Sequence, residues 1–142
     1  MSFLSRACIV LAAVLAFGGC GQQSSAPPAL AFPSQPSGHL EVEYPLDQTL
    51  FPPEIVAPTF VWSDETPGVA SWTVLLRFAD ENDGEVMRFV TAEPRWRPSE
   101  ADWATIKQRS TAGDAEVAIV GTGPEAKMAS AATVRIRTST DP

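Results

Sequence analysis

Few residues of this chain could carry out chemistry, because its 142 residues include two cysteines, Cys8 and Cys20, and one histidine, His39. A zinc cluster, a paired Cys–His nucleophile and a haem-attachment motif each need more of these residues. A Ser–His–Asp arrangement would depend on His39, which lies where a proline-rich stretch meets the folded region and is expected to be solvated. The sequence therefore predicts no metal site and no cofactor.

Carboxylates remain as a source of acid–base chemistry, for instance Glu93 with Glu100 or Asp102. A hydrolase would need such a pair in a cleft with shifted pKa values. Seventeen acidic residues in a small domain form such pairs by chance, so solvated side chains are the favoured interpretation. The acidic stretch 80–85 raises a calcium hypothesis, but EF-hand spacing would put Gly84 at a ligand position, and a solvated turn is preferred.

The four tryptophans of the chain are candidates for binding a ligand rather than for catalysis. Trp96 lies between Arg95 and Arg97, and aromatic faces beside hydrogen-bonding groups bind ligands, so a glycan-binding module is one hypothesis. The favoured alternative leaves Trp96 alone partly exposed. The three other tryptophans are then core anchors: Trp62, Trp72 and Trp103. A glycan-binding module should expose at least two tryptophans on one surface.

An apolar run of eleven residues, from Ala7 to Phe17, follows Arg6 near the amino terminus. A membrane-spanning helix needs about 20 apolar residues, so the run is too short to cross a bilayer. A positive residue before the run and small residues after it are typical of a signal peptide, which is expected over residues 1–19.

The closing Phe17-Gly18-Gly19-Cys20 resembles the lipobox of bacterial lipoproteins. The resemblance implies that Cys20 becomes the acylated first residue of the mature chain. It also implies delivery to the outer membrane, facing the periplasm, because Gly21 and Gln22 follow the cysteine in place of Asp. Several acyl chains on one residue would hold the protein firmly to its membrane.

Charge limits the partners of the mature chain. Loss of residues 1–19 removes Arg6 and leaves nine basic residues against seventeen acidic ones. No run of Lys or Arg is present to neutralise phosphates, which argues against nucleic-acid binding. An acidic domain is also repelled by anionic surfaces, so the lipid is expected to make the membrane contact alone.

Residues 20–39 are expected to form a tether rich in Pro, Ser and Gln that packs no core. Its prolines favour extended geometry, so it could place the domain up to roughly 50 Å from the membrane. Leu30 and Phe32 are its only large apolar residues, and they are expected to dock on nothing.

From Leu40 onward, short runs typical of β-strands alternate with turn residues. Residues 40–44 alternate strictly and predict an edge strand, and the prolines that follow suit a strand that kinks or changes sheet. Residues 72–78 and 85–92 predict a hairpin, and Leu75, on the opposite face from Trp72, implies partial cover of that face too. Further strands are predicted at 59–62, 116–120 and 133–138.

One short helix is predicted from Ser99 to about Gln108, because Ser99 and Asp102 form a start similar to a capping box. Trp103 and Ile106 are three residues apart, so they lie on one side of this helix and could close the end of a sandwich.

Six or seven short strands with one inserted helix and no βαβ alternation predict an antiparallel β-sandwich over residues 40–142. The strands at 60–62, 71–78, 116–120 and 134–138 resemble strands B, C, F and G of fibronectin type III-like and immunoglobulin-like domains. The segments Tyr44–Asp47 and Phe51–Glu54 resemble the start of sandwich modules at the front of larger envelope lipoproteins. The resemblance implies a fold more than an activity.

These features favour a noncatalytic module that acts as a spacer, docking or protein-interaction domain in the cell envelope. The chain stops at Pro142 directly after a strand, so a downstream domain is expected, and this domain or another envelope protein would be the partner. A carbohydrate-binding module is the alternative, and an envelope hydrolase is the least favoured of the three.

Overall fold

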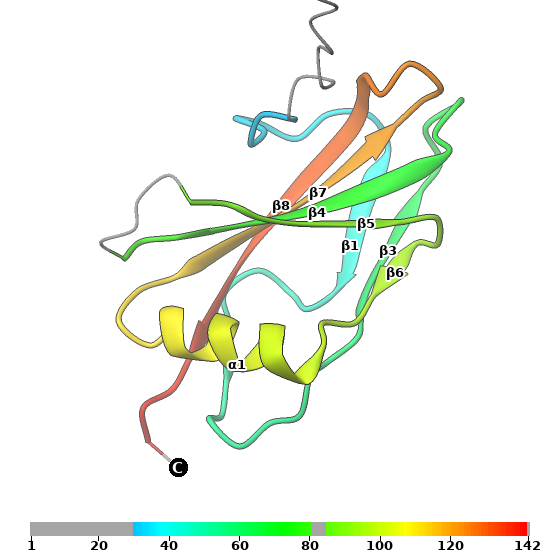
Figure 1. Cartoon of the computed structure of the whole chain (residues 1–142). Coiled ribbons are helices and arrows are strands. Elements are labelled where there is room, and N and C mark those ends of the chain that lie inside the picture. Colours follow the sequence, from blue (N-terminus) through cyan, green and yellow to red (C-terminus); the bar gives the residue numbers. More distant parts are fainter. Residues whose placement is uncertain (1–29, 81–84, 142) are drawn as a thin grey trace, which may run out of the picture.

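The computed structural model describes residues 30–80 and 85–141. Over these residues, runs of alternating apolar side chains form a mainly β structure with two sheets and one helix (Figure 1). The predicted signal peptide, Cys20 and residues 81–84 of the acidic turn lie outside the described residues. The elements are β1 (Leu40–Tyr44), β2 (Thr49–Phe51), β3 (Phe60–Asp64), β4 (Ser71–Phe78), β5 (Met87–Thr91), β6 (Arg95–Trp96), α1 (Glu100–Arg109), β7 (Ala115–Thr122) and β8 (Met128–Thr138).

The strands form a three-stranded sheet, in the order β1-β3-β6, and a five-stranded sheet, in the order β2-β8-β7-β4-β5. The first strand lies at a sheet edge, as its alternation predicts. The chain then passes through the cis Tyr44-Pro45 peptide, and β2 joins the other sheet parallel to β8. The predicted change of sheet is therefore confirmed, and the predicted hairpin is the antiparallel pair β4–β5.

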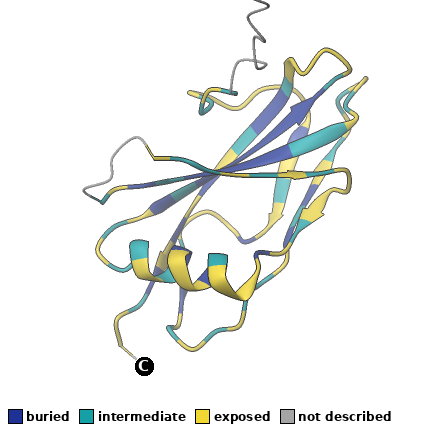
Figure 2. Cartoon of the chain, viewed as in Figure 1, coloured by how far each residue is buried: buried dark blue, intermediate teal, exposed yellow. Residues whose placement is uncertain are grey.

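The core lies between the two sheets, as the buried residues in Figure 2 show. One face of β4 supplies Val74, Leu76 and Phe78, which are at most 2% exposed, and Trp62 of β3 meets them from the other sheet. The last strand alternates as predicted, because Val134 and Ile136 are buried while Arg135 and Arg137 are exposed. Removing this shared apolar surface from water stabilises both sheets at once.

Helix α1 carries the chain from the three-stranded sheet to the five-stranded sheet across one end of the sandwich (Figure 1). Its amino terminus is capped as predicted, since the Ser99 hydroxyl accepts a hydrogen bond from the backbone N–H of Asp102 at 3.1 Å. Trp103 and Ile106 are its buried residues, and Trp103 meets Phe51 edge-on with ring centroids 5.4 Å apart. Within the described residues, no helix is long and apolar enough to span a membrane.

The outer face of the five-stranded sheet carries a second, smaller apolar cluster formed by Leu75, Ala118, Val120 and Ala131. Residues 30–37, which we call the strap, cross this face, and Leu30 and Phe32 pack against the cluster. Ser37 exchanges two backbone hydrogen bonds of 2.9 Å with Ala131 of β8. The cover predicted for the Leu75 face is confirmed, but the expectation that Leu30 and Phe32 dock on nothing is wrong.

Candidate functional site

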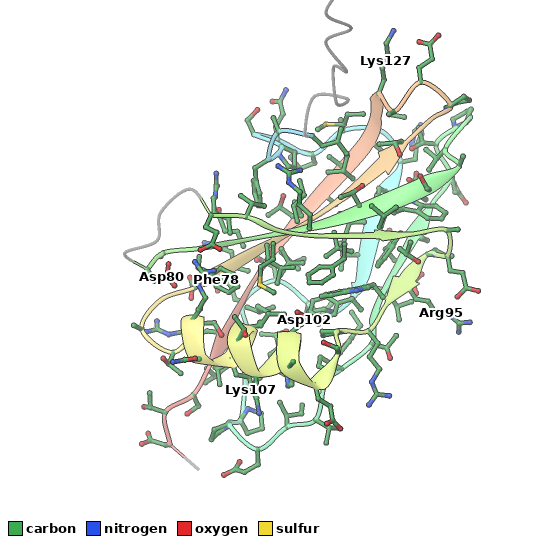
Figure 3. The ribbon with its side chains drawn as sticks, in the orientation of Figure 1. Phe78, Asp80, Arg95, Asp102, Lys107 and Lys127 are labelled. Carbon is green, nitrogen blue, oxygen red and sulfur yellow. The ribbon has the colours of Figure 1, made fainter. Side chains whose placement is uncertain are left out.

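The three residues predicted to bind a ligand do not converge on one surface. The Trp96 side chain is half-buried between Phe60, with ring centroids 5.3 Å apart, and Phe89, at 4.6 Å. Arg95 points outward from β6 and pairs with exposed Glu93 at 3.2 Å (Figure 3). The period of two along a strand explains this separation, since neighbours of an inward residue point outward.

The four tryptophans offer no exposed platform. Trp62 and Trp103 are 2% and 3% exposed, and Trp72 and Trp96 are half-buried against the core. Trp103 donates its indole N–H to the carbonyl oxygen of Ile55 at 2.9 Å. The condition for a glycan-binding module, two exposed tryptophans on one surface, is not met.

Arg97 instead lines a cavity of about 300 Å³ between α1 and the loop 54–57. Trp103 lies on its wall, and so does Lys107, whose ammonium donates to the carbonyl oxygen of Pro53 at 2.8 Å. Glu100 adds an acidic group, so the lining is mixed in charge. The aromatic residue that shares a cavity with Arg97 is therefore Trp103 rather than its sequence neighbour.

The carboxylates considered for acid–base catalysis are also separated. Glu93 is exposed beside Arg95, and Asp102 accepts a hydrogen bond of 2.7 Å from the Ser99 hydroxyl at the start of α1. Exposed Glu100 lies on the wall of the Arg97 cavity, which contains neither of the other two carboxylates among its lining residues. The structure therefore does not bring the predicted acid–base pair into one cleft.

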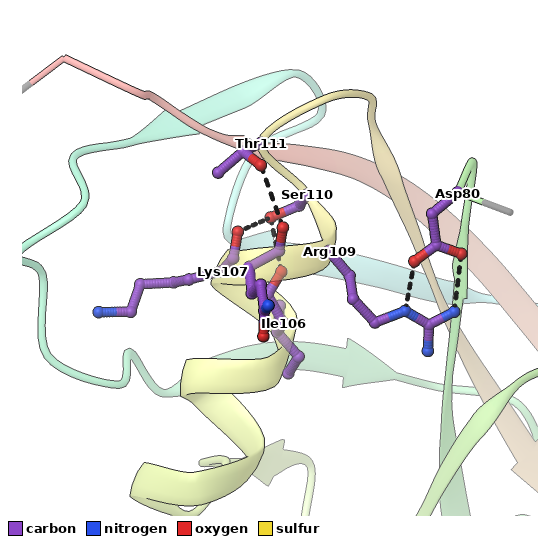
Figure 4. A network of polar contacts seen from close by, with 7 residues as sticks. Asp80, Ile106, Lys107, Arg109, Ser110 and Thr111 are labelled. Carbon is purple, nitrogen blue, oxygen red and sulfur yellow. Dashed lines mark hydrogen bonds and ion pairs between the residues drawn. The ribbon is translucent and has the colours of Figure 1, made fainter. Parts of the chain in front are cut away.

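Asp80, the first residue of the predicted acidic turn, binds an arginine (Figure 4). Arg109 of α1 donates to its two carboxylate oxygens at 2.6 and 2.9 Å and lies 4.1 Å from the ring centroid of Phe78. The Asp80 carboxylate raises the pKa of Arg109 through these hydrogen bonds. No group of three or more His, Cys, Asp or Glu arranged to hold a metal ion occurs in the part of the chain that the structure describes.

A row of charges crosses the outer face of the five-stranded sheet, and we call it the outer ladder. Arg77 of β4, Glu116 of β7 and Arg135 of β8 occupy matching register positions on adjacent strands. Arg77 donates to Glu116 at 2.7 Å, and Arg135 donates to Asp47 at 3.1 Å. The hydrogen bonds from Arg135 lower the pKa of the Asp47 carboxyl. Alternating signs directly opposite one another favour this register.

The strap and the outer ladder together line a hollow of about 620 Å³ on this face. Residues 32–36 form one wall, and Arg77, Glu116 and Arg135 lie on the floor with Thr133. The guanidinium of Arg77 stacks on the Phe32 ring at 4.1 Å from its centroid. Sequence patterns missed this site because its two sides lie more than 40 residues apart along the chain.

A second polar cluster fixes the carboxyl-terminal end of the strap, and we call it the Asp64 cluster. The Asp64 carboxylate accepts hydrogen bonds from the Trp72 indole at 2.9 Å, from the Ser130 hydroxyl at 2.6 Å and from the Thr66 backbone N–H at 3.0 Å. The Thr66 hydroxyl in turn accepts from the backbone N–H of His39 at 2.8 Å. The cluster joins β3, in one sheet, to β4 and β8, in the other.

Burial tends to raise the pKa of Asp64, but the hydrogen bonds from Ser130, Thr66 and Trp72 outweigh it and hold the pKa below its ordinary value. Asp64 is therefore a charged structural residue. His39, the sole histidine of the chain, is exposed, as predicted for a residue at the boundary between the tether and the domain. It joins the cluster through its backbone N–H alone.

Comparison with known protein families, with curated proteins and with solved structures finds no match to this chain. The site and the fold must therefore be interpreted from the residues themselves.

Proposed function

We propose that this chain is a noncatalytic, lipid-anchored β-sandwich that acts as a spacer or docking module of a bacterial cell envelope. One observation carries the proposal: the apolar run and Phe17-Gly18-Gly19-Cys20 precede, by about ten residues, a folded domain whose first described segment is fixed to its surface. A signal segment followed at once by an acylated cysteine and a folded body is the arrangement of an anchored lipoprotein.

The strand order supports an immunoglobulin-like or fibronectin type III-like sandwich. The neighbours β8-β7-β4-β5 correspond to strands G, F, C and C′ of such domains, and β1 and β3 correspond to A and B. Helix α1, placed between β6 and β7, is an addition to that pattern. Domains of this class host unrelated functions, so the fold supports a module and does not specify its partner.

The strap shortens the tether. Because Leu30 already contacts the sheet, about ten residues separate Cys20 from the domain, and ten extended residues span at most roughly 35 Å. Nine basic residues against seventeen acidic ones disfavour contact between the mature domain and an anionic membrane surface. The domain would therefore be held close to its membrane by the lipid and the short tether.

Metabolic labelling with an alkyne palmitate analogue tests the anchor. Cells producing the full chain should incorporate the label, and Cys20→Ala should lose it because the sulfur that carries lipid is gone. Cys8→Ala, a matched cysteine change within the predicted signal peptide, should label as well as the unchanged protein. Equal labelling of the Cys20→Ala variant and the unchanged protein would refute the anchor.

A further inference from the structure

The strap is attached to the sandwich at three points. Ser37 makes its two backbone hydrogen bonds with Ala131, Arg88 of β5 donates to the carbonyl oxygen of Leu30 at 2.8 Å, and Arg77 stacks on Phe32. Between these points the strap bridges the hollow of about 620 Å³ described above. Residues 34–36 are exposed, so this middle part adds little packing.

The surface beneath the strap is separate from the main core. Leu75 is its one large side chain, and the others are Ala118, Val120 and Ala131. The main core lies on the opposite face of the same sheet and contains no strap residue. The hydrogen bond from Arg77 to Glu116 involves no strap residue. Lifting the strap would thus expose a small apolar patch and leave the sandwich intact.

A fixed point ends the strap. Gly38 has a positive φ of 66°, and a Cβ there would lie 2.7 Å from the Thr66 hydroxyl oxygen and 2.8 Å from the Ser130 Cβ. Glycine is therefore required, and the backbone is held tightly at this position. The hydrogen bond from His39 to Thr66 holds the next residue. Movement of the strap would accordingly stop at Gly38.

We propose that the strap is a releasable part of the tether, which docks on the outer face of the five-stranded sheet and detaches as a unit while the sandwich stays folded. Pro33 and Pro36 keep a released strap extended. Its effect at the membrane rests on the proposed function: release of residues 30–37 would lengthen the free tether by up to about 25 Å, at 3.1 Å per residue.

Hydrogen–deuterium exchange of the purified full chain tests the release directly. The Ser37 amide reports the strap, and the Ile119 amide of central strand β7 reports the sandwich. Ser37 should exchange at least about tenfold faster than Ile119, yet more slowly than an unprotected amide. Phe32→Ala should speed exchange at Ser37 about tenfold and leave Ile119 unchanged. Val56→Ala, which removes an exposed apolar side chain from the loop beside α1, should change neither rate.

Three results would overturn the proposal. Equal exchange at Ser37 and Ile119 in the unchanged protein would make the strap part of one cooperative unit with the sandwich. Exchange of Ser37 at the unprotected rate would mean that the strap is not docked. No effect of Phe32→Ala on Ser37 would mean that the observed contacts do not hold the strap.

Replacement of both apolar strap residues tests the change in reach. Leu30 and Phe32 are the strap side chains that pack against the outer-face cluster, so Leu30→Ser/Phe32→Ser should keep the strap released. On a supported bilayer, this full-length variant should stand higher above the lipid than the unchanged protein, by up to about 25 Å. Val56→Ala, at an exposed side chain of the loop beside α1, is the control and should leave the height unchanged.

The exchange measurement and the height measurement distinguish a failure of this proposal from a failure of the proposed function. A protein that is not retained on the bilayer would contradict the lipid anchor, while the exchange measurement in solution would still decide whether the strap is released. A retained Leu30→Ser/Phe32→Ser variant that stands at the same height as the unchanged protein would contradict the strap as a control of reach.

Discussion

At the scale of single residues, Asp64 shows how tertiary contacts give a side chain a role that its local sequence hides. It ends a strand beside Ser63 and looks like a solvated carboxylate. In the structure it accepts hydrogen bonds from Trp72 and Ser130 and thereby ties the two sheets together. Gly121 makes this approach feasible, since a Cβ at that position would lie 2.7 Å from the Asp64 carboxylate.

Asp64→Asn should lower the free energy of unfolding by about 2 kcal/mol, because hydrogen bonds to a charged group are worth more than those to a neutral amide. Urea denaturation at neutral pH measures this change. Glu65→Gln, the same type of substitution at the exposed neighbour, should change stability by less than about 0.5 kcal/mol. Equal effects of the two variants would show that the Asp64 hydrogen bonds do not stabilise the fold.

The lowered pKa of Asp64 predicts a dependence of stability on pH. The folded pKa lies below the ordinary value of 3.8, so the stabilising contribution is complete above that value and is lost as pH falls through the folded pKa. The difference in unfolding free energy between the unchanged protein and Asp64→Asn should therefore shrink between about pH 5 and pH 2. A difference that stays constant over this range would contradict the assignment. Asp47 is present in both proteins, so its own titration cancels in the comparison.

At the scale of elements, α1 closes the end of the sandwich and is joined to β4 and β8. The hydroxyl of Ser110, at its carboxyl terminus, lies 2.9 Å from the Thr138 hydroxyl of β8. Arg109 donates two hydrogen bonds to Asp80, which follows β4 (Figure 4). Trp103, in the first half of the helix, packs edge-on against Phe51. The helix is thus held by a narrow apolar side with two buried residues, and polar contacts at its carboxyl end supplement this packing.

Arg109→Lys should destabilise the protein by about 1 kcal/mol, since a lysine cannot reproduce the two parallel hydrogen bonds to Asp80. Arg95→Lys provides a matched control, because the Arg95–Glu93 pair is exposed and such pairs contribute about 0 to 1 kcal/mol. Thermal unfolding of both variants measures the difference. A larger loss from Arg95→Lys than from Arg109→Lys would contradict the importance of the helix contact.

At the scale of the whole molecule, one core couples the two sheets. Residues of both sheets and of α1 belong to the same buried cluster, so the two sheets share their main core. We therefore expect a single cooperative unfolding transition for the sandwich. The strap lies outside that cluster and is the exception.

Leu76→Ala should cost about 2 to 5 kcal/mol, because Leu76 is fully buried and the substitution leaves a cavity between the sheets. Leu50→Ala removes the same atoms from a side chain that is 61% exposed and should cost less than about 0.5 kcal/mol. Chemical denaturation followed by tryptophan fluorescence and by circular dichroism should give coincident curves for both variants. Separate transitions by the two probes would show that the sheets unfold independently.

The local sequence was sufficient to predict most of the elements. Short runs typical of β-strands predicted β1, β3, β4, β5, β7 and β8, and Ser99 with Asp102 predicted α1, because strand patterns and helix capping depend on neighbouring residues. The two strands that it did not predict, β2 and β6, have three and two residues. Such short strands carry too little pattern of their own and form only because a partner strand is already in place.

Composition and local pattern by themselves determined the β-rich class, the capped helix and the inward faces of the strands. They also determined the core positions of Trp62 and Trp103. Each of these features follows from the hydrophobicity of a side chain and from the geometry of its own segment. Only the tertiary structure decided that Arg97 and Trp103 line one cavity, that Asp64 joins the sheets and that Leu30 and Phe32 dock on the cluster around Leu75. These contacts bring together residues that are distant in the chain, and their energies depend on distances that exist once the sheets have packed.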